Sequence, residues 1–264
     1  MRNLFSHVIL FVLSAAALRA APESIEVDEV SGYAYAEDAS GAIRQLEKGS
    51  VVFPGEKVTT APNAKVIIGF SNGVGMQVNG DSTFGVKLFQ QVSRPDDAKK
   101  PGEKGYSLIN INVEKGGVFT VAPASLNPAS SVCVTAPNGA RSYLDGNEGC
   151  YVKGDATAGE MVCLKGVAVV IPKVSSKITQ QVGRQEVLSF EGEEDKISQL
   201  GKDDFNELLG QLDASLARKL NSSGNQNQTA PDTNLPQIVQ QVQQVINDQV
   251  RQAKSQINPS PTGG

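Results

Sequence analysis

Short apolar segments with a two-residue period, separated by turns that contain glycine, fill residues 32–171. In residues 108–113, isoleucine and valine alternate with asparagine, which is the pattern of a strand with one buried face. Asn72-Gly73 and Asn79-Gly80 stand between such segments, and both dipeptides accept the positive φ angles of a tight hairpin turn. The pattern predicts an all-β domain built from consecutive hairpins.

We expect about a dozen short strands in a single domain over residues 21–190, joined by connections too short for crossover helices. This excludes a parallel α/β fold. The sequence Glu-Lys-Gly occurs at 47–49 and again at 114–116, and Leu-Lys-Gly follows at 164–166. These repeated tripeptides favour a stacked, solenoid-like roll. A two-sheet β-sandwich is the alternative, because periodicity does not encode the order of the strands.

Residues 191–220 predict an amphipathic helical segment. Asp204 is followed by Glu207 three positions later, which matches a capping box at a helix start. Apolar residues then recur at helical spacing. They are Phe205, Leu208, Leu209, Leu212, Leu216 and Leu220.

The last part of the chain predicts a linker, a second helix and a short tail. Residues 221–235 are rich in asparagine, serine and glutamine, which is typical of a flexible polar linker. Residues 236–258 carry isoleucine and valine at helical spacing with glutamine on the other face, and residues 259–264 are expected to be disordered. The amphipathic helix of residues 236–258 fits either a homo-oligomer contact or docking onto its own domain.

Residues 1–20 have the pattern of a signal peptide, because Arg2 precedes an apolar run and small residues end at Ala20. The apolar run is short for a membrane span and no later segment is long enough, so we expect no span in the mature chain. Cleavage removes Arg2 and Arg19 and no acidic residue, which changes the formal charge from −4 to −6. We expect a periplasmic or extracellular protein.

The composition of the mature chain disfavours several functions. It is mildly acidic without a dense basic patch, so nucleic acid is not an expected partner. Cleavage also removes His7, the single histidine, whereas Ser-His and Cys-His nucleophiles need an imidazole base. We therefore expect no catalytic residue, no metal site and no cofactor. Carboxylate pairs such as Asp145 with Glu148 are interpreted as solvated turn charges.

The three cysteines are Cys133, Cys150 and Cys163, and each lies in a predicted strand. If the strands that flank residues 154–159 pair symmetrically, opposed residues have numbers that add to 313, so Cys150 faces Cys163. Opposed side chains come within disulfide reach, and an oxidising compartment lets the bond form. The alternative is that all three are small apolar core residues. The mature chain has neither a histidine nor a C-x-x-C spacing to favour zinc.

A set of short motifs runs in a fixed order through the strand region. The motifs are Val30-x-Gly32, Leu46-x-x-Gly49, Pro54-Gly55-Glu56-x-Val58-x-Thr60, Ala64-x-Val66-x-Ile68-x-Phe70-x-Asn72-Gly73, Gly117-Val118, Val134-Thr135-x-Pro137, Gly149-Cys150-Tyr151-Val152 and Val162-x-Leu164-x-Gly166-Val167-x-Val169. Their order and spacing resemble the FecR domain, a family of extracytoplasmic all-β modules in bacteria. Glu56 and Asn72 depart from the family's aspartates, Cys150 stands where threonine is common, and residues 93–105 resemble an insertion.

The resemblance implies an all-β fold and an interaction role, with no catalytic residues to carry over. We expect an exported, non-enzymatic module that binds a protein or glycan of the bacterial cell envelope. The alternative is the sensory half of a cell-surface signalling relay, in which such domains act with an anti-sigma regulator and a sigma factor. A carbohydrate-active enzyme is a weaker alternative.

Overall fold

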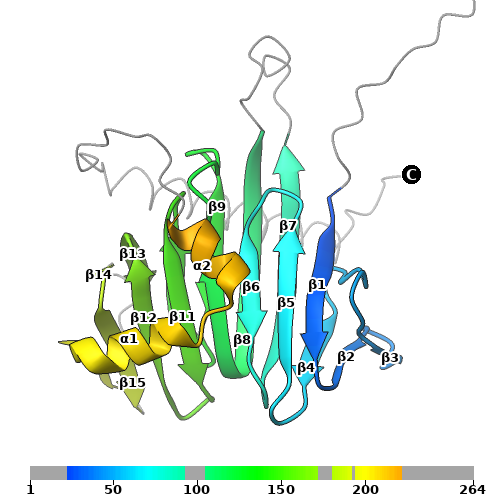
Figure 1. Cartoon of the computed structure of the whole chain (residues 1–264), viewed down its shortest axis with the longest axis horizontal. Coiled ribbons are helices and arrows are strands. Elements are labelled where there is room, and N and C mark those ends of the chain that lie inside the picture. The colour runs from blue at the N-terminus through cyan, green and yellow to red at the C-terminus, as the bar shows by residue number, and fades with distance from the viewer. Residues whose placement is uncertain (1–22, 93–104, 172–179, 192–193, 222–264) are drawn as a thin grey trace, which may run out of the picture.

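The computed structural model describes residues 23–92, 105–171, 180–191 and 194–221, and its fold is mostly β (Figure 1). The strands are β1 (Ile25–Ser31), β2 (Ala34–Glu37), β3 (Ile43–Gln45), β4 (Lys57–Thr60), β5 (Lys65–Phe70), β6 (Gly75–Val78), β7 (Thr83–Val92), β8 (Tyr106–Val121), β9 (Ser131–Thr135), β10 (Arg141–Leu144), β11 (Gly149–Gly154), β12 (Ala158–Lys165), β13 (Val167–Ile171), β14 (Gln180–Gly183), β15 (Glu186–Glu191) and β16 (Glu194–Gln199). The helices are α1 (Lys202–Gly210) and α2 (Ala214–Asn221). The predicted all-β fold with helices after the strands is confirmed, with sixteen strands among the described residues.

The strands form two sheets that share β8. Sheet A has the order β1-β5-β6-β8-β11-β12-β15-β16. Sheet B has the order β3-β2-β4-β7-β8-β9-β10-β13-β14. These neighbours are antiparallel except β8 and β9, which are parallel. The chain alternates between the two sheets while it advances along both, which resembles the path of the predicted roll. The two packed sheets resemble the layers of the sandwich alternative.

Strand β8 belongs to both sheets. Residues 106–115 pair with β7 and residues 108–112 with β9, whereas residues 118–121 pair with β6 and residues 116–121 with β11. Buried and partly exposed residues alternate in the first half of β8, so one face of sheet B points to solvent. The last five residues of β8 are all buried, because both faces of sheet A are covered there.

The main hydrophobic core lies between the two sheets. Ile68 and Val118 enter it from sheet A, and Phe84 and Ile111 enter it from sheet B; all four are fully buried. A second cluster lies on the outer face of sheet A, where α1 and α2 cross the strands (Figure 1). The molecule therefore has three layers, with helices over sheet A and sheet A over sheet B.

The region after β15 differs from the sequence prediction. Residues 194–199 form β16 rather than part of a helix, because they pair along their whole length with β15. The helical segment is divided into α1 and α2. The predicted capping box is absent, since α1 starts after Gly201 without a side-chain cap and Asp204 lies inside the helix. The acidic residues of this segment favour a helix start, but pairing with β15 in a hairpin determines its structure.

Residues 1–20, 222–235, 236–258 and 259–264 lie outside the described residues, as does nearly all of the loop at 93–105. The signal peptide, the linker, the second amphipathic helix and the tail therefore stay predictions. Within the described ranges, no helix has both the length and the apolar character needed to cross a membrane.

Candidate functional site

The outer face of sheet A carries an apolar surface that the two helices cover. Central strands β8, β11 and β12, with β15 beside them, supply the sheet side of this contact, and α1, α2 and the turn between them supply the other side. The buried residues from the sheet are Phe119, Val121, Tyr151, Val162, Leu164 and Val187. Those from the helical segment are Phe205, Leu208, Leu212, Leu216 and Leu220.

Two glycines let α2 lie directly on the strands. Gly75 and Gly149 pair with Val121 from its two sides, so the three residues form one row across β6, β8 and β11. A Cβ atom on Gly75 would lie 2.3 Å from Cδ2 of Leu216, and one on Gly149 would lie 2.8 Å from Cδ1 of Leu220. We call the Gly75–Val121–Gly149 row the helix seat. A side chain at either glycine would crowd the leucine that packs there.

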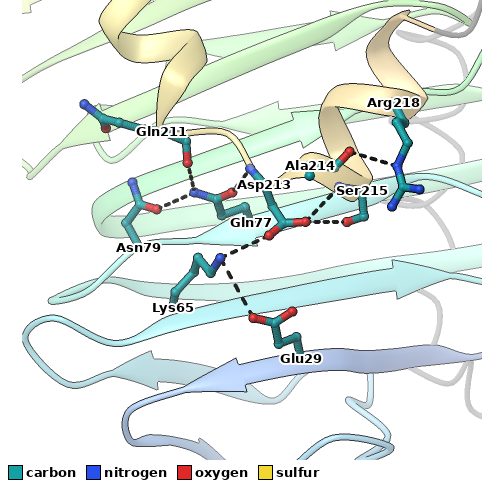
Figure 2. A network of polar contacts seen from close by, with 9 residues as sticks. All are labelled: Glu29, Lys65, Gln77, Asn79, Gln211, Asp213, Ala214, Ser215 and Arg218. Carbon is teal, nitrogen blue, oxygen red and sulfur yellow. Dashed lines mark hydrogen bonds and ion pairs between the residues drawn. The ribbon is translucent and has the colours of Figure 1, made fainter.

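The side chain of Gln77 binds the backbone of the turn between the two helices. Its side chain is buried on the outer face of sheet A, beside the helix seat. Figure 2 shows Nε2 donating to the carbonyl oxygen of Gln211 at 2.9 Å and to Oδ1 of Asn79 at 2.9 Å, while Oε1 accepts from the backbone N–H of Asp213 at 2.7 Å. The amide therefore pairs both a carbonyl and an N–H of the turn, as a neighbouring strand would.

Asp213 caps α2 and ties it to sheet A. Its Oδ1 accepts hydrogen bonds from the backbone N–H and the hydroxyl of Ser215, at 2.8 and 2.7 Å. Its Oδ2 accepts from Nζ of Lys65 at 3.0 Å, and that ammonium also lies 3.9 Å from Glu29 (Figure 2). The Ser215 hydrogen bonds, followed by Lys65, lower the pKa of Asp213 to about 2.

Lys165 holds the other end of α2. Its ammonium donates to the carbonyl oxygen of Leu220 in the last turn and to Oδ1 of Asn147 at 2.7 Å. Burial lowers the pKa of Lys165, and the nearby charge of Arg184 adds to this effect. A cation at a helix C-terminus compensates the partial negative charge of the unpaired carbonyls. The two ends of α2 are thus bound by lysines of sheet A, Lys65 on β5 through Asp213 and Lys165 on β12.

These contacts together hold the chain's own α2 on the outer face of sheet A. Glycines provide the shape, Gln77 binds a backbone turn, and Lys65 and Lys165 bind the polar groups at the two ends of α2. None of these groups is arranged around a reacting atom. The face binds a helical segment of the same chain by shape and by hydrogen bonds to its backbone.

A hollow of about 340 Å³ opens beside Asn79, but its features have structural explanations. Lys115 and Asp81 in its wall form an ion pair at 2.8 Å, which neutralises their charges. A Cβ on Gly116 would lie 2.2 Å from Oγ of Ser82, so this glycine is required by packing. The hollow therefore indicates no particular ligand.

An exposed apolar region lies at the β3 end of the molecule. Ile43 is 63% exposed and Phe53 57% exposed, and all the exposed large apolar residues among the described ranges fall within residues 33–53. The guanidinium of Arg44 lies 5.9 Å from the Phe53 ring centroid and donates to Glu56 at 2.6 Å. Arg44 thus joins Phe53 to Glu56 at this end of the molecule.

The cysteines are placed as the register argument requires. Cys150 on β11 is the direct partner of Cys163 on β12, and the pairs that follow along this hairpin keep numbers that add to 313. Both side chains face the main core, and Cys133 lies on β9 in sheet B. The structure carries all three as thiols, so the disulfide stays a prediction.

Other residues that the sequence analysis considered have structural roles. Oε2 of Glu148 accepts the backbone N–H of Asp145 at 2.7 Å, which closes a turn. Tyr151 is buried and its ring lies 4.3 Å from that of Phe119. Among the described residues, no cluster of histidine, cysteine or carboxylate side chains could hold a metal ion.

Sequence reasoning did not identify the helix seat. The available signal was the lack of apolar–polar alternation at 161–164, and at 117–122 apart from Thr120, which indicates strands covered on both faces. The isolated glutamine at the centre of Gly75–Val78 was a second signal, because a buried polar residue needs a partner.

No family model matches the chain, and no curated protein matches it. Two solved structures of a protein described as a "putative anti-sigma factor" from Parabacteroides distasonis ATCC 8503 are similar to it. Each has a TM-score of 0.43 and 10% sequence identity and covers 58% of this chain. The match spans 64% and 63% of those two chains, which is less than two thirds of their length. A structure described as a cell surface anchoring domain is similar over 23% of this chain and 80% of its own, with 28% identity and a TM-score of 0.22.

Proposed function

We propose that the mature chain is an exported, non-enzymatic, FecR-like module of the bacterial cell envelope that binds proteins through the outer face of sheet A. The single observation that carries the proposal is the helix seat with Gln77 beside it, because this arrangement binds a helix by shape and by backbone contacts. The chain's own α2 occupies the seat. The expected partner is an envelope protein that presents an amphipathic helix with leucines four residues apart, as in Leu212, Leu216 and Leu220.

The positions of the motif glycines support the FecR-like part of this proposal. Five of these glycines adopt positive φ angles between 82° and 95°, which L-residues rarely accept. They are Gly32, Gly49, Gly55, Gly73 and Gly166. Glu56 keeps the role that a short acidic residue would have there, since its carboxylate accepts the N–H of Phe53 at 2.8 Å and closes the Pro54-Gly55 turn. The resemblance thus follows positions at which the backbone demands particular residues.

A labelled peptide of residues 202–221 tests helix binding directly. The receptor is the mature chain with Leu216→Ala and Leu220→Ala, which weakens its own α2 and leaves the seat unchanged. We expect fluorescence anisotropy to rise on titration with this receptor. The matched control adds Gly75→Leu to the same receptor and fills the seat. Hydrogen exchange of β8 amides verifies that both receptors keep their sheets.

The outcome separates two interpretations of the outer face. Binding to the first receptor and loss of binding to the control support a helix-recognition site. Equal binding to both receptors, or binding to neither while the sheets stay protected, contradicts the proposal and leaves α1 and α2 as a fixed covering layer.

A further inference from the structure

We propose that Cys150 and Cys163 form a disulfide that joins β11 to β12 in the exported protein. The observation behind this inference is their register, because each cysteine is the other's direct partner in an antiparallel pair. It goes beyond the helix-binding proposal and does not depend on it.

The local geometry fits a cross-strand bridge. Directly paired residues of antiparallel strands have Cα atoms roughly 4.5–5.5 Å apart, and disulfides span Cα distances of roughly 4.4–6.8 Å. Cys150 is 0% exposed and Cys163 1% exposed, and both belong to the core between the sheets. Their neighbours Tyr151 and Val162 belong to the outer cluster, so the two thiols share the inner face.

The position of the pair connects it to the helix seat. Gly149, which receives Leu220, precedes Cys150, and Leu164 of the outer cluster follows Cys163. A bridge on the inner face therefore fixes the two strands whose outer face contacts α2. Cys133 lies on β9 in sheet B and is left as the third thiol.

The bond forms by thiol–disulfide exchange with an oxidised dithiol oxidoreductase or with glutathione disulfide. One cysteine thiolate attacks the oxidant's disulfide, which breaks and releases one of its sulfurs as a thiolate. The second cysteine then attacks the mixed disulfide, and the oxidant leaves with both electrons. Two protons pass from the protein's thiols to the reduced oxidant.

Burial determines when exchange takes place. Removal from water raises the pKa of the Cys150 thiol, and the neighbouring Cys163 raises it further, so the reactive thiolate is disfavoured in the folded chain. The bridge therefore forms while β11 and β12 are still accessible. Once the core has closed, a small reductant reaches the bond only when the hairpin opens.

The test uses the chain without residues 1–20, refolded in a mixture of reduced and oxidised glutathione. This makes the result independent of export. The protein is quenched with N-ethylmaleimide in denaturant, digested and analysed by mass spectrometry. We expect one alkylated residue, Cys133, and one peptide pair that links Cys150 to Cys163. Three alkylated cysteines, or a link that includes Cys133, overturns the proposal.

A stability measurement gives an independent readout. Closing a loop of this length should raise the melting temperature by roughly 6–12 °C for a domain of this size. Cys133→Ala is the matched control and should keep the full difference between oxidised and reduced protein. Cys150→Ala and Cys163→Ala should each abolish that difference. If the melting temperature of either variant still differs between oxidised and reduced protein, the assignment is contradicted. The mass measurement is made on the wild-type sequence and needs no variant.

Discussion

Gln77 is a fully satisfied polar side chain in an otherwise apolar surface. Both hydrogens of Nε2 and the oxygen Oε1 are used, and two of the three contacts go to the backbone around Gln211 and Asp213. The residue therefore fixes where the turn between α1 and α2 lies, whatever side chains the turn carries. This explains how a polar residue is kept in a layer where apolar burial provides most of the free energy.

We predict that Gln77→Met weakens the docking of α2. Methionine keeps the size of the side chain but removes the hydrogen bonds to the carbonyl of Gln211 and the N–H of Asp213, and each part-buried hydrogen bond contributes about 0.5–1.5 kcal/mol. Urea unfolding should show a lower free energy of unfolding, with α2 amides exchanging faster than those of β8. Gln45→Met, at an exposed position on β3, is the control and should have little effect. An unchanged α2 in the Gln77 variant would contradict this role.

We predict that Gly75→Ala destabilises the protein and that a second change restores it. The new Cβ would lie 2.3 Å from Cδ2 of Leu216, and overpacking of this kind costs about 1–3 kcal/mol. Adding Leu216→Ala should remove the clash, so the two changes should not be additive in a double-mutant cycle. Gly210→Ala, where no atom lies within 4 Å of the added Cβ, is the control. Additive effects of the pair would show that Gly75 acts elsewhere.

At the scale of elements, the hairpins follow from local sequence. The Asn72-Gly73 turn joins β5 to β6, with Gly73 at φ 94° and Oδ1 of Asn72 accepting the N–H of Val74 at 3.1 Å. The register of β11 with β12 followed from the symmetry of their connection. In both cases the information lies within a few residues of the turn, where turn geometry fixes pairing.

The missed elements depend on contacts between distant residues. The sequence of β16 resembles the charged start of a helix, but the segment pairs along its whole length with β15 in an antiparallel hairpin. The helix seat unites Gly75 and Gly149 through Val121, and nothing in the sequence near either glycine specifies that row. Neither glycine has a positive φ angle, so its role is to leave room for the leucine packed on it. That contact exists only in the folded chain.

The cap of α2 should make its docking sensitive to acid. The folded pKa of Asp213 is about 2, below the ordinary 3.8, so the ionised carboxylate favours the folded state. Its contribution is complete above about pH 4 and is lost as the pH falls from 3.8 toward 2. Asp213→Asn should therefore show less loss of melting temperature over this range than the wild type. Asp203→Asn, at an exposed position on α1, should behave as the wild type.

Parallel acid profiles for the wild type and Asp213→Asn would contradict the assignment. The readout is the difference between the two proteins, because they differ only at position 213.

At the scale of the whole molecule, the expected route out of the cytoplasm is open to a direct test. We predict that bacteria expressing the full chain place it in the periplasmic or extracellular fraction, with Ala21 as its first residue. Fractionation followed by intact-mass measurement checks both points. The control carries Leu10→Arg and Val12→Arg, which interrupt the apolar run and should leave the precursor in the cytoplasm. An uncleaved wild-type chain in the cytosol would contradict the prediction.

Strand β8 has a mechanical consequence for the two layers of the molecule. Its first half is bonded into sheet B and its second half into sheet A. Sliding one layer past the other along β8 would break its hydrogen bonds to β7 and β9 or those to β6 and β11. Because each set lies along one continuous strand, several of these bonds would have to break together. The shared strand therefore couples the two layers mechanically, with α2 held on the half that lies in sheet A.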